Sequence, residues 1–403
     1  MSYKDKVVYF FDRVRDVKVR DILSIFPMIL ALFLSLFLKK RYKNSWLFTE
    51  DPNEAKDNGF VLFKYVYENE KEIESYYAIN KRSKDYLKLK NYNNIIEYGS
   101  LKHWIIYFCC KFNISSQKGG KPNAAICAFF ELNGIFKNKN IFLQHGVIIN
   151  NLEWLYNKNS AIKKFVTSTI PEYNYIVKNF GYNIEDILLT GLPRFDNLHD
   201  IQAVKNQILI MPTWRSWFVM NSKIKDHSNE EFISSNYLRK WEELINSERF
   251  DALIKKYNLR VIFYPHRQMQ PFIDEFSSTD NIIIANDKKY DVQNLLKTSK
   301  VLITDYSSVF FDMIYMKKPV MFYQFDYDEF REYQYKEGYF DYKDNSFGKS
   351  FDNVDDILIN LEQIIKENYK VSDKYLLEHK EYFKYFDTKN SKRIVDILKS
   401  TNI

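Results

Sequence analysis

Residues 301–327 read VLITDYSSVFFDMIYMKKPVMFYQFDY, in which two apolar runs are separated by a segment long enough for a helix. Runs such as VLIT and PVMFYQ are typical of strands that are covered on both faces. A strand, a crossover helix and a second strand form the βαβ unit of parallel sheets. The stretch therefore predicts a parallel sheet, with the turn Asp305–Ser308 at the carboxyl edge, where such sheets bind ligands.

Ser307 and Ser308 stand in this turn, at the start of the predicted helix. A helix that begins on small hydroxyl residues offers free backbone N–H groups to an anion, so the turn is a candidate phosphate site. Ser and Asp are also preferred as ordinary helix N-caps, and the turn taken alone leaves that structural role open.

Two further strands end in groups suited to binding or proton transfer. Gln207–Met211 runs into Pro212-Thr213-Trp214-Arg215, and Arg260–Tyr264 runs into Pro265-His266-Arg267. Parallel strands deliver such side chains to one edge of a sheet. With the serine turn they predict a cationic, donor-rich pocket suited to a diphosphate.

The rest of the chain alternates apolar runs with segments long enough for helices, such as Gly59–Glu70 and Pro171–Phe180. The upstream runs predicted as strands are Ser45–Phe48, Ser75–Ile79, Asn94–Glu97, Ala124–Phe130, Ile141–Leu143, Lys164–Val166 and Ile187–Leu189. This alternation is typical of a doubly wound α/β domain. The pattern breaks at 191–194 and restarts at Gln207, which predicts a second domain of the same kind.

Three regions follow from this division: a basic and apolar membrane-association segment at 1–43, a first Rossmann-like domain at 44–205, and a second at 206–403. From Val354 onward apolar residues recur at helical spacing. We expect the last segment, Ser391–Lys399, to pack back across the domains.

Composition limits the class of protein. A chain of 403 residues is too long for one ordinary core, and a hydrophobic content of 46% excludes a disordered protein. The net charge of +7 comes without a long Lys/Arg block interleaved with aromatic residues, so nucleic acid is not an expected partner. The three cysteines have no metal-binding spacing, which fits a reducing, cytosolic setting.

Residues 22–38, ILSIFPMILALFLSLFL, carry no charge and lie between basic flanks. The flanks contain Arg13, Arg15, Lys18 and Arg20 before the stretch and Lys39, Lys40 and Arg41 after it. The stretch is slightly short for a spanning helix, and basic residues on both sides remove the asymmetry that orients one. No small-residue cleavage site follows. We expect a helix or helical hairpin lying in the cytoplasmic leaflet; the alternative is a buried helix of the soluble fold.

A histidine and a glycine follow the predicted strand Ile141–Leu143, in the sequence Gln144-His145-Gly146. The glycine allows a tight turn, and a neutral imidazole can accept a proton from a hydroxyl group at neutral pH. His145 is therefore a candidate general base if the two domains face each other across a cleft. A structural turn histidine is the alternative.

Several common sites are absent from the sequence. There is no G-x-x-x-x-G-K-[ST], no G-x-G-x-x-G, no H-E-x-x-H and no C-x-x-C. No compact carboxylate cluster demands a metal, although Asp326 and Asp328 leave a divalent metal requirement open, and no cofactor is evident.

Six motifs in order resemble the CDP-glycerol glycerophosphotransferase family, the teichoic-acid primases and polymerases and their capsule-cluster relatives. They are FLQHGV (142–147), LLTGLPRFDNL (188–198), PTWR (212–215), YPHR (264–267), TDYSSVFFD (304–312) and KPVMFYQFDYDEF (318–330). The resemblance covers roughly Ser45 to Ile397. It implies a GT-B-like fold, in which two Rossmann-like domains face each other across a cleft and the second domain holds most of the nucleotide.

The resemblance also implies roles for residues. His145 and His266 correspond to the two essential histidines of the family, and Gly146 and Arg194 are expected at the acceptor side of the cleft. The residues expected to hold the nucleotide and its phosphates are Thr213, Arg215, Arg267, Thr304, Asp305, Ser307 and Ser308, with no metal ligand among them. The long polymerases more often carry Trp-His-Gly where this chain reads Gln-His-Gly, and have an extra amino-terminal region, so a primase or single-unit transferase is expected.

The implied activity is transfer of a polyol phosphate, first of all glycerol phosphate, from a CDP-polyol to a lipid-linked or polymer acceptor, with release of CMP, at the cytoplasmic face of a Gram-positive-type cell membrane. The alternatives are a GT-B glycosyltransferase or sugar-nucleotide epimerase, and an inactive membrane-bound nucleotide-binding scaffold. Glycerol versus ribitol, teichoic acid versus capsule, and oligomeric state stay open.

Overall fold

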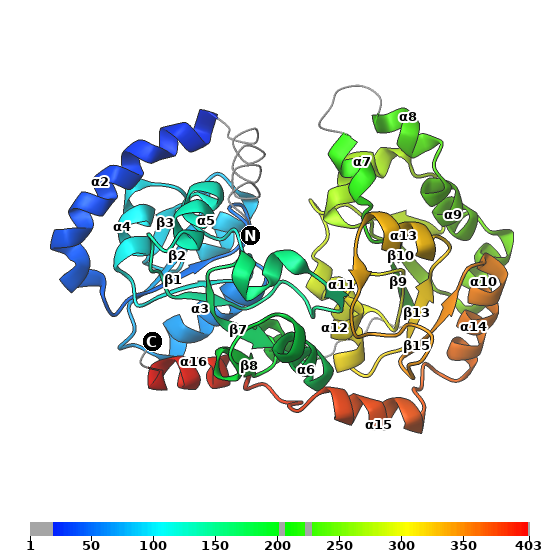
Figure 1. Cartoon of the computed structure of the whole chain (residues 1–403). Coiled ribbons are helices and arrows are strands. Elements are labelled where there is room, and N and C mark those ends of the chain that lie inside the picture. The colour runs from blue at the N-terminus through cyan, green and yellow to red at the C-terminus, as the bar shows by residue number, and fades with distance from the viewer. Residues whose placement is uncertain (1–18, 201–205, 222–227, 402–403) are drawn as a thin grey trace.

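The computed structural model describes residues 19–200, 206–221 and 228–401, which form two parallel sheets, each flanked by helices (Figure 1). The first sheet has the order β3-β2-β1-β4-β5-β7-β8. Its strands are β1 (Trp46–Thr49), β2 (Ser75–Ile79), β3 (Ile95–Glu97), β4 (Phe112–Ser115), β5 (Asn140–Phe142), β7 (Ile162–Thr167) and β8 (Ile187–Leu189). Its helices are α2 (Val19–Tyr42), α3 (Asn58–Asn69), α4 (Leu101–Cys109), α5 (Ala124–Leu132) and α6 (Ile170–Asn179).

The second sheet has the order β11-β10-β9-β12-β13-β15. Its strands are β9 (Gln207–Met211), β10 (Arg260–Phe263), β11 (Ile282–Ile284), β12 (Val301–Thr304), β13 (Val320–Tyr323) and β15 (Gly348–Phe351). Its helices are α7 (Ser216–Asn221), α8 (Ser228–Ile233), α9 (Asn236–Ile245), α10 (Glu248–Tyr257), α11 (Val292–Thr298), α12 (Phe310–Tyr315), α13 (Tyr327–Tyr333), α14 (Val354–Lys366) and α15 (Asp373–Tyr382). The predicted doubly wound α/β fold is confirmed.

The stretch at 301–327 forms the predicted βαβ unit. Strand β12 pairs in parallel with β9 on one side and β13 on the other, and its four residues are buried. Strands β9 and β12 lead to opposite halves of the sheet, so the strand order reverses between them. Ligands of open α/β sheets bind at the carboxyl side of such a reversal, and the turns after β9 and β12 lie there.

The prediction of a strand at Ala124–Phe130 is wrong, because these residues form most of α5. A continuous apolar run fits a buried strand and a buried helix equally well. The side chain of Asn123 accepts a hydrogen bond from the N–H of Ile126 at 3.0 Å and caps the helix. The place in the sheet is taken by β4, whose sequence FNIS is too short and too polar for the pattern to predict.

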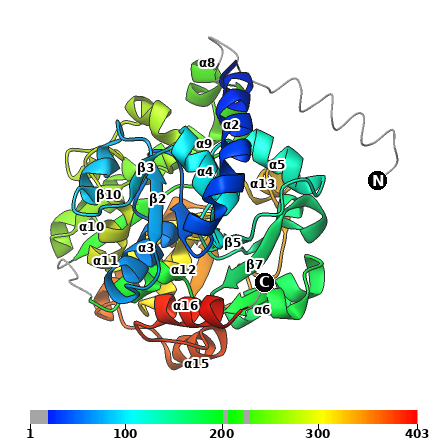
Figure 2. The ribbon, with the colours of Figure 1, turned by 90° about the vertical axis from the view of Figure 1, so that its left-hand side faces the viewer.

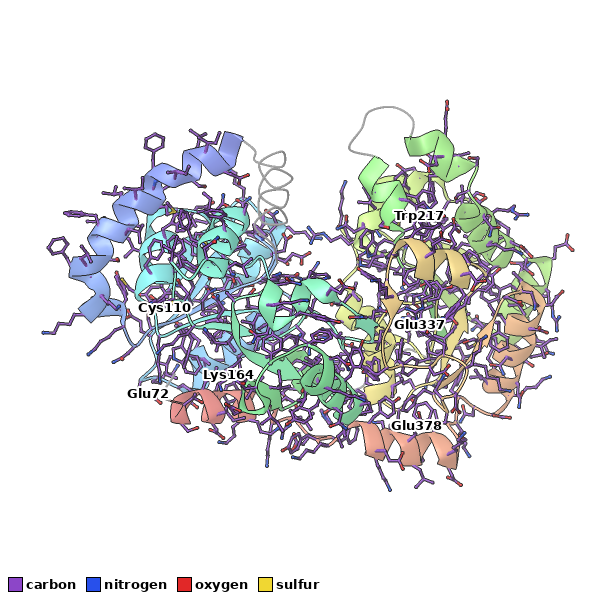
Figure 3. All side chains as sticks on the ribbon, viewed as in Figure 1. Glu72, Cys110, Lys164, Trp217, Glu337 and Glu378 are labelled. Atoms are coloured by element: carbon purple, nitrogen blue, oxygen red, sulfur yellow. The ribbon has the colours of Figure 1, made fainter. Side chains whose placement is uncertain are left out.

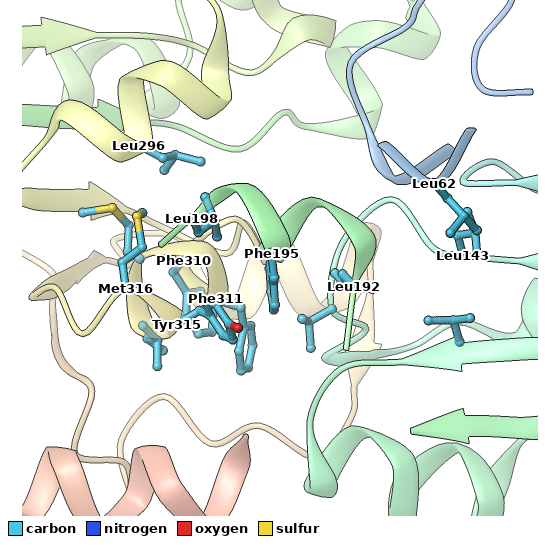
Figure 4. Packing of buried hydrophobic residues seen from close by; sticks show 14 of the residues in the cluster. Leu62, Leu143, Leu192, Phe195, Leu198, Leu296, Phe310, Phe311, Tyr315 and Met316 are labelled. Carbon is cyan, nitrogen blue, oxygen red and sulfur yellow. The ribbon is translucent and has the colours of Figure 1, made fainter. Parts of the chain in front are cut away.

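Apolar packing joins the two sheets. Leu192, Phe195 and Leu198 lie in or beside the short helix η5 (Pro193–Asn197) and pack on residues of α12 (Figure 4). The rings of Phe195 and Tyr315 stack with their centroids 4.4 Å apart. One buried cluster therefore contains residues from both sheets and from the segments between them.

Two further contacts cross between the sheets. The short strands β6 (Asn150–Asn151) and β14 (Lys336–Glu337) pair antiparallel, and side chains from both sides fill this junction (Figure 3). Helix α16 (Asn390–Ser400) lies below the first sheet and packs on α3 and η5 (Figure 1). The domain boundaries near residues 43 and 205 stay predictions, and residues 201–205 lie outside the described residues.

Helix α2 runs along the outer side of the first sheet and packs on α4 (Figure 2). Met28 and Ala31, on its inner face, are buried, whereas its outer face exposes Phe26 at 73% and Leu36 at 75%. By length and composition, 21–42 is the one described helix that could cross a membrane. The basic flank at Arg13, Arg15 and Lys18 lies outside the described residues.

Candidate active site

The turns after β9 and β12 are fastened to each other by Asp305. Its carboxylate is buried and accepts hydrogen bonds from the N–H of Thr213 at 2.8 Å and of Tyr306 at 2.7 Å. The hydroxyl of Thr304 is also buried and donates to the carbonyl of Met211 at 2.7 Å. Both side chains therefore shape the edge of the pocket, and the expected direct phosphate contact does not fit their placement.

Arg215 was expected to clamp a phosphate, but its side chain is fully buried. Its Nη2 lies 2.9 Å from Oδ2 of Asp305, and its Nε lies 2.8 Å from Oδ2 of Asp326. The guanidinium also lies over the rings of Tyr237 and Tyr306, at 4.8 and 5.2 Å from the ring centroids. Arg215 is thus saturated by internal partners, and it holds the turn instead of facing the cleft.

Ser307 and Ser308 are half-buried at the cleft, and α12 begins only at Phe310. The N–H groups of Phe310 and Phe311 bond to the carbonyls of Ser307 and Ser308 at 3.3 and 3.1 Å. Among the described residues, the N–H groups of Ser307 and Ser308 have no hydrogen-bond partner, although the helix starts two residues later than predicted. Within the described residues, the buried hydroxyl of Thr213 has no hydrogen-bond partner.

The His-Gly turn of the first sheet lies directly against this serine turn. A Cβ added to Gly146 would lie 2.8 Å from Oγ of Ser308 and 3.9 Å from Nη2 of Arg194. Only glycine permits that approach without displacing the serine. The structure thus brings the adjacent residues His145 and Gly146 together with Arg194 and Ser308, which lie far from them in the sequence.

His145 follows β5, and its side chain is 65% exposed. Its Nδ1 lies 2.6 Å from Oδ2 of Asp57. The negative charge of Asp57 raises the pKa of His145. Burial acts to raise the pKa of Asp57, but the charges of His145 and Arg194 outweigh it, and the pKa is lowered. Imidazolium and carboxylate stabilise each other, while the other edge of the ring is left for a reacting group.

Arg194 is buried behind this pair and does not line the acceptor side of the cleft as expected. Its Nη1 lies 3.1 Å from Oδ1 of Asp57 and also donates to the carbonyl of His145. Its Nε and Nη2 donate to the two carboxylate oxygens of Asp312 at 2.8 and 2.7 Å. Arg194 therefore links the turn of His145 to α12.

Asp57 and Asp312 were missed as site residues. Asp57 contacts a residue 88 positions away, and an acidic residue just before a helix resembles an ordinary cap. Asp312 ends the motif TDYSSVFFD at 304–312, where an inward-facing carboxylate could have been suspected from the apolar residues around it.

His266 follows β10 and is half-buried beside Trp214, with ring centroids 6.3 Å apart. Its Nδ1 accepts a hydrogen bond from the N–H of Gln268 at 3.1 Å, so the neutral ring carries its proton on Nε2. Burial, followed by the positive charges of His145 and Arg267, lowers the pKa of His266 to about 3. His266 is then a neutral hydrogen-bond donor on the opposite side of the cleft from His145.

Arg267 reaches across the cleft. Its Nη1 lies 2.6 Å from Oε1 of Glu54 and 3.7 Å from Oδ2 of Asp51, both from the first sheet. A cavity of about 200 Å³ beside this contact is lined by residues of both sides. In this structure Arg267 pairs with carboxylates, and a phosphate would have to replace Glu54 as its partner.

Within residues 19–200, 206–221 and 228–401, no group of three or more His, Cys, Asp or Glu side chains is arranged to hold a metal ion. Asp326, which left a metal site open in the sequence, pairs with Arg215 instead. The activity assay with and without EDTA tests whether the reaction requires a divalent metal.

The chain is similar to proteins of teichoic acid synthesis. The chain is 37% identical over 368 residues to the minor teichoic acid biosynthesis protein GgaB of Bacillus subtilis strain 168, which covers 88% of this chain and 40% of GgaB. It is 27% identical over 257 residues to the teichoic acid poly(ribitol-phosphate) polymerase of Bacillus spizizenii strain W23, covering 60% of this chain and 38% of that protein. The chain thus spans about two fifths of the length of these relatives.

Among solved structures, the wall teichoic acid polymerase TagF, in a variant soaked with CDPG, superposes with a TM-score of 0.67 at 16% identity, covering 99% of this chain and 98% of that one. This likeness confirms the expected GT-B-like fold. The family model for CDP-glycerol:poly(glycerophosphate) glycerophosphotransferases matches residues 30–400. The chain therefore belongs to the CDP-glycerol:poly(glycerophosphate) glycerophosphotransferase family.

Proposed function

We propose that this protein transfers a polyol phosphate, with glycerol phosphate as the first candidate, from a CDP-polyol to a hydroxyl of a lipid-linked saccharide or polyol-phosphate acceptor in teichoic acid or capsule synthesis. One observation carries the proposal. The exposed ring of His145, held by Asp57, lies on a turn that contacts the serine turn of the second sheet. This contact supports the proposal that His145 acts as a base beside a phosphate bound at the serine turn.

The reaction is an in-line displacement at the β-phosphorus of the donor. Nε2 of His145 accepts the proton of the acceptor hydroxyl, whose oxygen forms a new bond to that phosphorus. The bond from the β-phosphorus to the bridging oxygen breaks, and CMP leaves with that oxygen. Such transfers depend mainly on positioning and on stabilising charge.

The second sheet supplies the groups that receive the developing charge. Nε2–H of His266 and the free N–H groups of the serine turn are neutral donors, and Arg267 supplies a positive charge once it leaves Glu54. A bound diphosphate would raise the pKa of His266 again, because an anion favours the protonated ring.

Nucleotide release tests the proposal. Purified protein in detergent is incubated with CDP-glycerol, CDP-ribitol and a panel of UDP-sugars, with and without a lipid-linked disaccharide acceptor, and in parallel with EDTA. Acceptor-dependent release of CMP is expected, and the donor that supports it names the polyol. Release of UDP alone would assign the chain to the glycosyltransferases, and no release from any donor would favour the inactive scaffold.

We further propose that α2 lies in the cytoplasmic leaflet, parallel to the membrane. Both ends of the helix are tied to the first sheet: Oδ1 of Asp21 accepts from Asn123 at 2.8 Å, and Arg41 pairs with Glu74 through two hydrogen bonds. One face packs on α4, and the opposite face exposes large apolar side chains. An apolar face of this kind, with basic residues at its end, suits a helix in the membrane interface.

Substitution of both Phe26 and Phe37 by Asp is expected to weaken binding to vesicles of phosphatidylglycerol and phosphatidylcholine by roughly tenfold or more, because each ring contributes about 1.5–3 kcal/mol when buried. Co-sedimentation measures the bound fraction. Leu377→Asp is the matched control, since Leu377 is exposed on α15, away from α2. Equal binding of the double variant and the control would contradict the interfacial placement.

A further inference from the structure

We propose that Asp57 is the positioning residue of His145, and that Arg194 of η5, itself held by Asp312 of α12, keeps Asp57 in place. The inference rests on the proposed function, because it concerns the residue proposed as the base. It adds Asp57 and Asp312, neither of which the sequence motifs assigned to the reaction.

The contact between Asp57 and His145 fixes the tautomer of the imidazole. A carboxylate oxygen 2.6 Å from Nδ1 can only accept, so the neutral ring carries its proton on Nδ1 and presents the lone pair of Nε2 to the cleft. Without this partner, the ring is free to take the other tautomer and other rotamers. Once the acceptor proton has moved to Nε2, Asp57 faces an imidazolium and stabilises it.

The ordinary explanation for an Asp at this position is helix capping, and the structure assigns that task to another residue. Asp57 stands at the N-cap of α3, yet its side chain makes no capping hydrogen bond there. Oε1 of Glu50 accepts from the N–H groups of Asp57 and Phe60 at 3.0 and 2.6 Å instead. The carboxylate of Asp57 is thereby left for His145 and Arg194.

Arg194 makes the arrangement depend on both sheets. Its guanidinium is held by both oxygens of Asp312, and it contacts Asp57 from the other side. Asp312 belongs to α12, the helix that follows the serine turn. The base and the proposed phosphate site are therefore set relative to each other by buried ionic contacts.

The pH dependence of activity follows from the charges around His145. The groups that face it are Asp57 from α3, Arg194 from η5, Glu54 from the first sheet, and His266 and Arg267 from the second. Asp57 raises the pKa of His145 above its ordinary value of about 6.5. Only the neutral ring acts as a base, so kcat/KM is expected to rise with pH through this raised pKa.

Asp57→Asn is expected to lower kcat by roughly 10² to 10⁴-fold, because the amide can hold the wrong tautomer of His145. The KM for the donor should stay unchanged. The acid limb of the pH profile of kcat/KM should move to lower pH, because the carboxylate that raises the pKa of His145 is lost. Asp57→Glu should recover part of the activity, and Asp312→Asn should shift the acid limb in the same direction. Asp186→Asn is the matched control, since Asp186 pairs with Lys164 at 2.8 Å away from the cleft.

The outcomes separate this inference from the proposed function. A normal kcat and pH profile of Asp57→Asn, together with an inactive His145→Ala, would overturn the positioning role alone. Activity of His145→Ala would overturn the proposed base itself. If Asp57→Asn does not fold, an NMR titration of His145 in the unmodified protein decides: a pKa above 6.5 supports the pairing, and one at or below 6.5 overturns it.

Discussion

His145→Ala is expected to lower turnover by roughly 10² to 10⁴-fold, the usual contribution of a positioned general base. The variant leaves the pocket of the second sheet intact, so affinity for the CDP-polyol should stay close to that of the unmodified protein. The effect should thus appear in kcat and hardly in donor binding, because the lost interaction belongs to the transition state.

Single-turnover release of CMP measures the chemical step, and calorimetric titration with the donor measures binding. His199→Gln is the matched control, because His199 bonds to the hydroxyl of Tyr315 at 2.9 Å in the junction below the cleft. Near-normal turnover of His145→Ala would contradict the mechanism, whereas a parallel loss of donor binding would point to a role in the fold of the cleft.

Arg215→Met is expected to destabilise the protein by about 3–5 kcal/mol, because removing one partner of a buried ion pair leaves an uncompensated charge. Here two carboxylates, those of Asp305 and Asp326, lose their guanidinium, and both are buried. The turn after β12 depends on Asp305 through its bond to Thr213. Loss of stability should therefore be accompanied by loss of donor binding.

Urea denaturation followed by circular dichroism measures the free energy of unfolding. Arg249→Met is the matched control, because Arg249 pairs with the exposed Asp355 at 3.2 Å, and such surface pairs contribute about 0–1 kcal/mol. Adding Asp305→Asn and Asp326→Asn to Arg215→Met should recover part of the loss. Equal stability of Arg215→Met and Arg249→Met would refute the buried clamp.

The sequence was sufficient for the two sheets, apart from β4, and for the turns at their carboxyl edges, since both follow from local patterns. The apolar run at 301–304 predicts a buried strand, and the polar residues after it predict the turn at the carboxyl end of that strand. Likewise, His145 and Ser308 could each be placed at the carboxyl edge of its own sheet, and the family resemblance implied that the two edges face each other across a cleft. Their close approach at Gly146 depends on how the two sheets pack against each other. Local sequence patterns do not predict that packing.

The directions of the arginine side chains could not be predicted for a related reason. An Arg after a strand looks the same in sequence whether it faces the cleft, like Arg267, or the interior, like Arg215. The choice depends on acidic partners that the fold brings from elsewhere, such as Asp326, which is 111 positions from Arg215. The position of each arginine in the chain predicted that it lies at the carboxyl edge of the sheet. The acidic partners determined which arginine faces the cleft.

The buried cluster at η5 and α12 means that the chain behaves as one cooperative body, although it contains two sheets. Phe195 and Tyr315 stack across the junction, and separating them would expose apolar rings at a cost of about 1.5–3 kcal/mol for each. Domains that are joined by small polar interfaces move relative to each other, but here one buried apolar cluster contains residues of both halves. Access to the cleft then depends on small rearrangements, such as the release of Arg267 from Glu54, and both halves melt together.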